Sequence, residues 1–427
     1  MNTKRCHIPF FVVDRPMSLE LLRYCEIDKQ EGVFGLMGHA NTSKRFQNLF
    51  REFEGDNIIK AADSGVFSKE GCKLDYEDLF SIYEIMGIEY GIMIDFLKDK
   101  DKTIESAKKA MEIYKEESRS FKLVGVTQGN TSEEYLECYN ELKSTGFDYI
   151  AIGGLLKKNV NSARWVRVKD ENFLKEVLEK IRSNYKKDWL FLLGCYHPKR
   201  HRLFEEFNVF GGDYKGWILN YRTPEMWVEE LNRELVSFEA KNTEYYSKLQ
   251  TLEKVLDMDK GTKRGYRFKQ IRAYLDNNVF SLFRDYLLII SCSQRKASIS
   301  NPAPAIELYD GPFFKMIRRM KQEGKFPRGV HILIISAKYG LLGSYDLIEK
   351  YDQEMTEKRA EELKQEINIE LNKFLRNKRF KEIFIGMGKN YCLSLEKFKF
   401  EIPLEYATGK IGEKLSRTKE WINSREI

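Results

Sequence analysis

The sequence of 427 residues has few cysteines, and none of them stands in a paired motif. The seven cysteines are Cys6, Cys25, Cys72, Cys138, Cys195, Cys292 and Cys392. Because no two of them have Cys-x-x-Cys spacing, the sequence gives no sign of a disulfide framework. We therefore expect reduced thiols in a cytoplasmic protein.

Long apolar runs are also absent. The start of the chain, MNTKRCHIPFFVVDRP, contains an apolar run that is too short for a signal peptide or a membrane span. Internal repeats and low-complexity tracts are absent as well. These absences predict a soluble protein with no membrane partner.

The sequence does contain enough apolar residues for two cores. Apolar residues make up 42% and aromatic residues 13% of the chain, and a chain of this length exceeds the size at which a single core usually stops growing. Charged residues make up 32%, and the formal net charge is +7. This modest positive excess only slightly favours a polyanionic partner such as nucleic acid.

Short apolar runs typical of buried strands alternate with amphipathic stretches up to about residue 213. The expected strands span residues 8–13, 33–39, 57–63, 90–95, 122–128, 149–155, 189–194 and 208–213. Between them lie helical patterns such as SKRFQNLFREFE and TIESAKKAMEIYKEE, several of which begin at residues suited to helix caps. Eight strands alternating with helices predict a (β/α)8 TIM barrel, and an open doubly wound sheet is the alternative.

The pattern changes after residue 213. A helical stretch without strands leads into a second α/β pattern, with strands expected over residues 287–293, 330–340 and 382–388. The domains we expect are a TIM barrel over 1–223, a helical and partly basic linker over 224–285, and a small three-layer α/β domain over 286–427.

Polar residues and glycines end the expected barrel strands. In α/β barrels the chemistry lies at the carboxyl ends of the strands, because the loops there vary without disturbing the core. In strand order, these ends carry Asp14, His39, Asp63 with Ser64 and Gly65, Asp95, Gln128 with Gly129, Gly153 with Gly154, Cys195 with His197, and Asp213. Any single aspartate at such a position is often a structural cap. Several carboxylates with an amide and two glycines on one rim indicate a binding site.

The residue types at this rim suit a planar heterocycle. Carboxylates that face one cavity repel each other, which favours a protonated carboxyl or a substrate rich in N–H groups. An aspartate can accept the N1–H and the exocyclic amine of a purine-like base, while Gln128 addresses its carbonyl and the glycines let a flat ligand approach. A second aspartate can then attack a sugar carbon, as carboxylates do in covalent glycosyl transfer.

Four motifs carry a resemblance to a known family. In chain order they are ADSGVFS, MIDFLKD, GVTQGNTSEEYLECYNEL with GFDYIAIGGL, and FGGDYKGW. In order and spacing they resemble the tRNA-guanine transglycosylase superfamily, and they look closest to its branch that inserts a 7-deazaguanine into DNA. The resemblance covers residues 8 to 225, about half of the chain.

The resemblance implies roles for the rim residues. Asp213 would be the nucleophile that bonds to the sugar C1′, and Asp63 would be the acid/base residue. The substrate-binding residues would be Ser64, Asp95, Gln128, Gly129, Gly153 and Gly154. Among these, Asp95 would grip the guanine edge, and Gln128 and Gly154 would recognise the base carbonyl.

The implied chemistry needs no redox or nucleotide cofactor. The tRNA enzymes of the superfamily carry a Cys-x-Cys-x-x-Cys cluster with a distant histidine for structural zinc, and no such spacing follows Asp213. Cys195, His197 and His201 lie close together in GCYHPKRH, but such residues beside a strand end usually pack or hydrogen-bond. The sequence therefore leaves a zinc site open, while DYKGW after the nucleophile favours the DNA branch.

Basic residues interleaved with aromatics follow the helical stretch. They are Lys260, Lys263, Arg264, Arg267, Lys269 and Arg272. This pattern is typical of phosphate contact with base stacking, and it equally suits a solvated helix face. We therefore expect nucleic-acid contact here only in combination with the barrel's implied substrate.

Two strand ends in the C-terminal domain, SCSQRK and SAKYG, resemble more faintly a family of uncharacterised α/β domains. Their hydroxyl groups, thiol and lysines suit a phosphate or a base, and they equally suit ordinary loops. A nucleophilic role for Cys292 is disfavoured, because the one histidine of this domain, His331, falls at a strand start.

We therefore expect a pentosyltransferase that exchanges guanine in nucleic acid for a 7-deazaguanine such as the 7-cyano form. The nucleic acid would be DNA in preference to tRNA. The same exchange on tRNA is one alternative, and a catalytically silent nucleic-acid-binding subunit is another. The presence of both Asp63 and Asp213 argues against a silent subunit.

Overall fold

The computed structural model describes residues 7–65, 74–155, 171–219, 257–300 and 302–425. The chain forms two compact units. The first comprises Met1–Asp28 and Val33–Trp217, and the second comprises Lys29–Gly32 and Ile218–Ile427. Every described helix is too short or too polar to cross a membrane.

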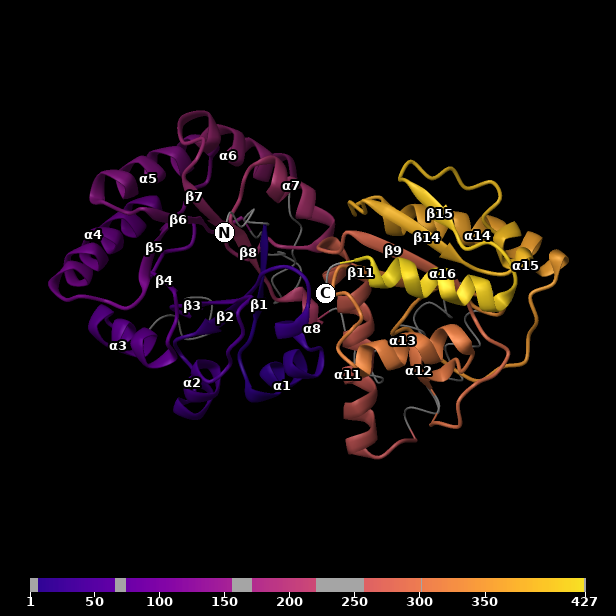
Figure 1. Ribbon diagram of the computed structural model, residues 1–427. Helices are drawn as coiled ribbons and strands as arrows, with labels where there is room; N and C mark the ends of the chain where they lie inside the picture. The colour runs from indigo at the N-terminus through magenta and orange to yellow at the C-terminus, as the bar shows by residue number, and fades with distance from the viewer. Residues whose placement is uncertain (1–6, 66–73, 156–170, 220–256, 301, 426–427) are drawn as a thin grey trace, which may run out of the picture. The chain divides into compact units, whose positions relative to one another are not determined.

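The first unit is a closed barrel of eight parallel strands (Figure 1). The strands are β1 (Ile8–Val12), β2 (Phe34–His39), β3 (Ile58–Asp63), β4 (Tyr90–Ile92), β5 (Lys122–Thr127), β6 (Tyr149–Ile152), β7 (Trp189–Leu192) and β8 (Gly211–Tyr214). Each strand pairs with the next, and β8 closes the barrel by pairing with β1. The predicted TIM barrel is confirmed, and the open doubly wound sheet is wrong.

Helices alternate with the strands around the outside of the barrel (Figure 1). They are α1 (Pro16–Tyr24), α2 (Lys44–Arg51), α3 (Tyr76–Met86), α4 (Lys100–Glu116), α5 (Ser132–Thr145), α6 (Glu171–Asn184), α7 (His201–Glu206) and α8 (Gly216–Leu219), with the 3-10 turns η1 (Ile27–Lys29) and η2 (Pro198–Arg200). Four of them begin at a capping side chain that accepts a backbone N–H three residues on, namely Ser43, Asp75, Asp99 and Thr131.

Aromatic rings fill the barrel interior. Tyr90 stacks on Trp189 with ring centroids 5.1 Å apart, and Phe10 meets Phe191 edge-on at 5.0 Å. Gly35 makes room for this packing, because a Cβ there would lie 2.1 Å from the Phe10 ring. The interior is therefore a packed core, and a site on this unit must lie on the rim.

The second unit is a further α/β region built on a five-stranded sheet in the order β12-β11-β9-β14-β15. Its strands are β9 (Tyr286–Ser291), β11 (Val330–Ser336), β12 (Gly340–Gly343), β14 (Glu382–Gly386) and β15 (Leu404–Tyr406), while β10 (Ala303–Pro304) pairs with β13 (Leu347–Ile348). β12 runs antiparallel to β11, and the other neighbours are parallel. The three apolar runs expected as strands form β9, β11 and β14.

Helices of the second unit cover the sheet's apolar residues. They are α11 (Lys260–Asn278), α12 (Ala305–Leu308), α13 (Pro312–Gln322), α14 (Glu357–Leu375), α15 (Lys389–Leu393) and α16 (Ile411–Asn423), with the 3-10 turn η3 (Phe280–Leu282). α11 falls within the stretch expected as a linker, yet it buries Ile271 and Leu275 completely. This helix is therefore part of the packed unit.

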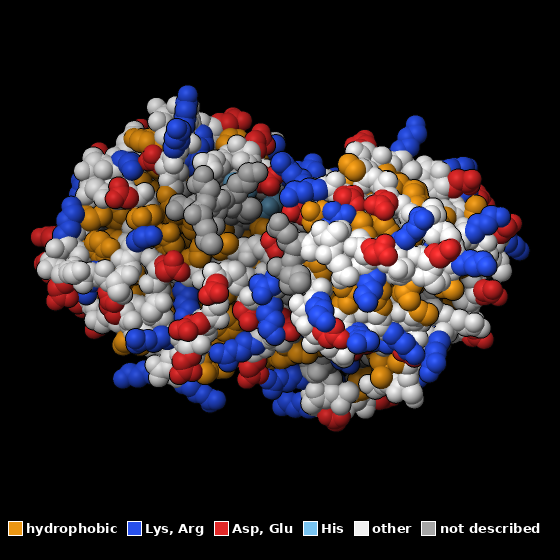
Figure 2. All heavy atoms as spheres, viewed as in Figure 1, with side chains coloured by type: hydrophobic (Ala, Val, Ile, Leu, Met, Phe, Trp, Pro, Cys, Tyr) orange, Lys and Arg blue, Asp and Glu red, His pale blue; other side chains and the backbone are white. Residues whose placement is uncertain are grey.

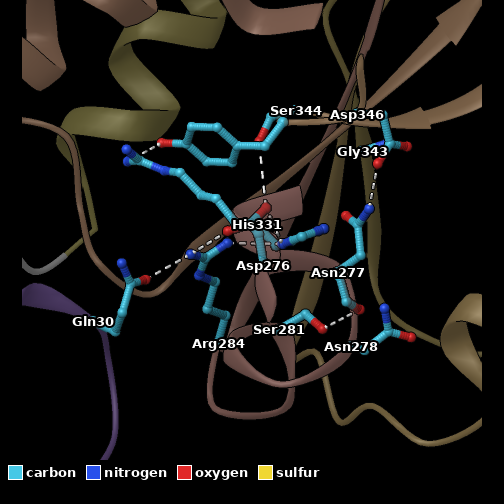
Figure 3. Close-up of polar contacts among 12 residues, drawn as sticks. Gln30, Asp276, Asn277, Asn278, Ser281, Arg284, His331, Gly343, Ser344 and Asp346 are labelled. Carbon is cyan, nitrogen blue, oxygen red and sulfur yellow. Dashed lines mark hydrogen bonds and ion pairs between the residues drawn. The ribbon is translucent and has the colours of Figure 1, made fainter. Parts of the chain in front are cut away.

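A buried polar network joins α11 to the sheet (Figure 3). Asp276 on α11 accepts from the Arg284 guanidinium at 2.8 Å, and Arg284 Nη1 lies 2.8 Å from His331 Nδ1 on β11. Burial raises the pKa of Asp276, but the charge of Arg284 outweighs it and the pKa is lowered. Burial lowers the pKa of His331 to about 3, so its neutral Nδ1 can accept from Arg284. The network thus holds a compensated charge pair inside the fold.

Candidate functional site at the barrel rim

The carboxyl ends of neighbouring strands bring several predicted site residues together. Asp63 is the last residue of β3, beside His39 at the end of β2. Asp95 follows β4, Gln128 follows β5, and Asp213 lies within β8. All of them therefore sit at one end of the barrel, because the strands are parallel.

Asp63 and His39 form a close pair. The Asp63 carboxylate lies 3.7 Å from His39 Nδ1, and it also accepts long hydrogen bonds from Ser64 Oγ and the Gly65 N–H, both at 3.4 Å. Burial lowers the pKa of His39, but the nearby carboxylate of Asp63, with a contribution from Asp213, outweighs it and raises the pKa. The pair can therefore hold and pass a proton at this point of the rim.

Asp95 is almost completely buried, with 2% of its surface exposed. Burial, together with the nearby charge of Asp63, raises its pKa to about 7. Gln128 donates to Asp95 Oδ2 at 2.5 Å and accepts from the Lys98 N–H at 3.1 Å, so both ends of its amide are held. Near neutral pH this carboxyl group therefore changes protonation easily, which is typical of a binding or catalytic site.

The two glycines after β6 make room for Gln128. A Cβ at Gly153 would lie 2.5 Å from Gln128 Nε2, and a Cβ at Gly154 would lie 2.1 Å from Gln128 Oε1. Gly154 also has φ +70°, a conformation that favours glycine. From the sequence, these glycines were expected to let a flat ligand approach. In the structure they let the Gln128 amide lie against β6 and reach Asp95.

Asp213 is held by the backbone after β7. Its carboxylate accepts from the Gly194 N–H, and its own carbonyl accepts from the Tyr196 N–H at 3.2 Å. Two residues on, Lys215 Nζ lies 2.6 Å from Asp14 Oδ2 at the end of β1. This side of the rim thus carries a fixed carboxylate beside a lysine and the His39 imidazole.

Two predicted binding residues have clear packing roles. Gly129 faces α5, because a Cβ there would lie 2.9 Å from both Glu134 Cβ and Tyr135 N. Ser64 is completely buried, and its hydroxyl donates to Asp63. His39 was expected at the rim, but no role was assigned to it. Its position directly at a strand end was the sequence signal that could have indicated a role.

The histidines and cysteine after β7 serve the local fold. His197 Nδ1 accepts from the Lys199 N–H at 3.2 Å, His201 Nδ1 lies 3.0 Å from the Tyr196 hydroxyl, and Cys195 is completely buried. Among the residues that the structure describes, no group of three or more His, Cys, Asp or Glu side chains could hold a metal ion. These residues therefore do not fit a zinc site.

Helix α11 carries all six of the predicted basic contacts. Lys260 and Arg264 are exposed, whereas Lys263, Arg267 and Lys269 are half-buried. Arg272 donates to the Tyr345 hydroxyl at 3.1 Å and lies over its ring at 4.3 Å. Arg272 is thus held within the second unit. Basic and acidic side chains are interspersed over the face of the molecule that Figure 2 draws.

The fold and the rim define a TIM barrel with a carboxylate-rich site, followed by a separate α/β region. Residues 287–420, within that region, match a protein family of unknown function (DUF6884). No curated protein matches the chain.

Proposed function

We propose that the barrel exchanges guanine in DNA for a 7-deazaguanine derivative, such as the 7-cyano form, through a covalent glycosyl-aspartate. One observation carries the proposal: Asp63, Asp95 and Asp213, which are far apart in the chain, occupy one rim. One carboxylate can then bond to sugar while another holds the base. The proposal includes nucleic acid as partner and requires no cofactor for the chemistry.

Asp95 and Gln128 would recognise the base. The Asp95 carboxylate would accept the N1–H and the exocyclic amine, and two such donors favour its charged form. Gln128 Nε2 already donates to Asp95, and an amide nitrogen carries a second hydrogen for the base carbonyl. The contact with Lys98 fixes the amide orientation, so this recognition would need little rearrangement.

Asp213 would act as the nucleophile in a double displacement. Its oxygen bonds to C1′ while the C1′–N9 bond breaks, and guanine leaves with the bonding pair and takes up a proton from Asp63. In the second half, Asp63 removes the N9 proton of the incoming base, whose nitrogen attacks C1′ and releases Asp213. His39 lies 3.7 Å from Asp63 and would share that proton between the two halves.

The exchange is tested by incubating the full-length protein with DNA or tRNA and labelled guanine or 7-cyano-7-deazaguanine. We expect label in DNA, and Asp213→Asn should lower its rate by more than about 10³-fold, because the nucleophile is removed. Asp148→Asn is the matched control, since Asp148 is exposed and precedes β6 at the opposite end of the barrel. Label in tRNA alone would favour the tRNA alternative. Label in neither polymer would favour the silent subunit.

The exposed basic residues of α11 would contact the phosphates of the nucleic acid. Lys260 and Arg264 lie one turn apart on the helix, so they present charge on one side. Replacing both with Gln should weaken DNA binding, and should reduce the slope of log affinity against log salt by about 1 for each phosphate that the protein no longer neutralises. Arg319→Gln, at an exposed position on α13, is the control. An unchanged salt slope in the double variant would contradict a role for α11.

A further inference from the structure

In the sheet of the second unit, the order in which successive strands are added reverses at β9. The chain passes from β9 to β11 on one side, and then returns to β14 on the other side of β9. In open parallel sheets, ligands bind outside the carboxyl ends of the strands at such a switch point. The residues after β9, β11 and β14 are therefore the place to look for a second site.

Hydroxyl groups and a thiol converge at these three strand ends. Cys292, directly after β9, has its Sγ 3.1 Å from the hydroxyl of Tyr391 on α15. Ser336, the last residue of β11, lies 3.1 Å from the Tyr309 hydroxyl and 2.9 Å from the Tyr351 hydroxyl, and the two tyrosine hydroxyls are 2.8 Å apart. These side chains come from loops far apart in the sequence, so the fold itself assembles the cluster.

Two lysines flank this cluster. Lys296 Nζ lies 4.2 Å from the Tyr351 ring centroid, and Lys338 Nζ lies 5.7 Å from the same centroid. The backbone pairing of Lys296 with Tyr309 and the hydrogen bond from Arg359 Nε to the Ala337 carbonyl at 2.8 Å hold the two loops in place. Both ammonium groups therefore lie near the same tyrosine ring, on loops that these contacts hold in place.

Among the described residues, no carboxylate lies within ion-pair distance of Lys296 or Lys338. Lys364, by contrast, pairs with both Glu361 and Glu396. Burial lowers the pKa of Lys296, and the opposing effects of Cys292 and Asp352 do not outweigh it. An anion bound between the two ammonium groups would supply the missing charge.

We propose that the cluster of Cys292, Lys296, Ser336, Lys338 and Tyr351 binds a phosphate group. The two ammonium groups would neutralise the phosphate, and the Tyr351 hydroxyl would donate to its oxygens. Ser336 is completely buried and would orient the Tyr351 hydroxyl. The phosphate can belong to a small nucleotide or to a nucleic-acid strand, since the two share this chemistry. The site is independent of the base exchange proposed for the barrel.

The test measures binding of pyrophosphate, a nucleoside monophosphate and a short 5′-phosphorylated oligonucleotide to the full-length protein by calorimetry. We expect the Lys296→Gln, Lys338→Gln double variant to bind at least one of these probes 10-fold or more weakly. Lys381→Gln is the control, because Lys381 directly precedes β14 and so lies at the amino ends of the parallel strands, away from the cluster. Equal affinity in the native protein and the double variant, or binding of no probe, would overturn the proposal.

A second readout locates the phosphate without any substitution. Mass spectrometry of the alkylated protein reports the modification rate of Cys292, which a ligand beside it should slow 5-fold or more. Protection by the monophosphate indicates a small ligand, and protection by the oligonucleotide alone indicates a nucleic-acid strand. An unchanged Cys292 rate at saturating ligand would place the phosphate elsewhere and overturn the assignment.

Discussion

Two aspartates, one in each unit, are buried to the same extent but behave in opposite ways. Asp95 at the barrel rim and Asp276 on α11 are each 2% exposed. Burial, with the charge of Asp63, raises the pKa of Asp95 to about 7. For Asp276 burial acts in the same direction, but the charge of Arg284 outweighs it and lowers the pKa.

The difference lies in the partners. Asp276 has a guanidinium at 2.8 Å, whereas Asp95 has the neutral amide of Gln128 and a second carboxylate nearby. A buried charge with a partner contributes to holding the fold, while one without a partner is costly and is typical of a functional site. Burial alone therefore does not distinguish a structural carboxylate from a functional one, but the charge of its neighbours does.

The largest effect should come from breaking the compensated pair. Asp276→Asn keeps the shape of the side chain and leaves Arg284 buried without its counter-charge, so we expect a loss of about 3–5 kcal/mol in the free energy of unfolding. The measurement is chemical denaturation at neutral pH.

Asp285→Asn provides the matched comparison in the same unit. Asp285 pairs with Lys381 at 2.7 Å on the surface, and an exposed pair of this kind contributes about 0–1 kcal/mol. If the two substitutions lower the free energy of unfolding by the same amount, the Arg284 network does not compensate the charge of Asp276. The contrast between Asp276 and Asp95 would then fail.

The second effect concerns how the rim holds Gln128 against Asp95. Gly154→Ala places a side chain at a positive φ and puts its Cβ 2.1 Å from Gln128 Oε1. We therefore expect the free energy of unfolding to fall by about 2–4 kcal/mol and the Gln128 amide to be displaced. Gly324→Ala is the control, because Gly324 has nearly the same φ, +69°, and open space around its Cβ. Its cost should be about 1 kcal/mol. Equal costs in denaturation would show that Gln128 moves aside freely.

Much of the barrel could be predicted from the sequence because its strands are buried on both faces. Largely apolar runs therefore marked the strands up to β7, and the parallel arrangement placed their polar ends on one rim. The run expected at 208–213 begins before the last strand, β8, which spans Gly211–Tyr214. The strand ends were less certain. The run ending at Asp95 was expected as strand throughout, but β4 stops at Ile92 and the last three residues form the rim.

The second unit was predicted less completely. Its buried strands and long helices had clear apolar patterns, but β15 (Leu404–Tyr406) is short and largely exposed, so it had no such pattern. The contacts that the site residues make could not be predicted from the sequence either. That Gly154 accommodates Gln128, or that Arg284 compensates Asp276, depends on contacts between distant segments that no local pattern records.

The smallest expected effect tests the uncompensated carboxylate itself. The pKa of Asp95 is about 7 in the folded protein and about 3.9 in an unfolded chain. Between these values the folded state binds more protons, so the contribution of this group to stability falls as pH rises from about 4 to 7.

Asp95→Asn removes the charge that is unfavourable above pH 7, so the variant should be more stable than the native protein by about 1–3 kcal/mol at pH 8. At pH 5.5 Asp95 is protonated in the folded native protein, so the stability difference between Asp95→Asn and the native protein should be smaller. Asp276→Asn should destabilise at both pH values, since the lowered pKa keeps Asp276 charged in the folded state across this range. Denaturation at pH 5.5 and 8 measures all three proteins. If Asp95→Asn were destabilising to the same degree at both pH values, the charge of Asp95 would be compensated after all, and the two buried aspartates would not differ in kind.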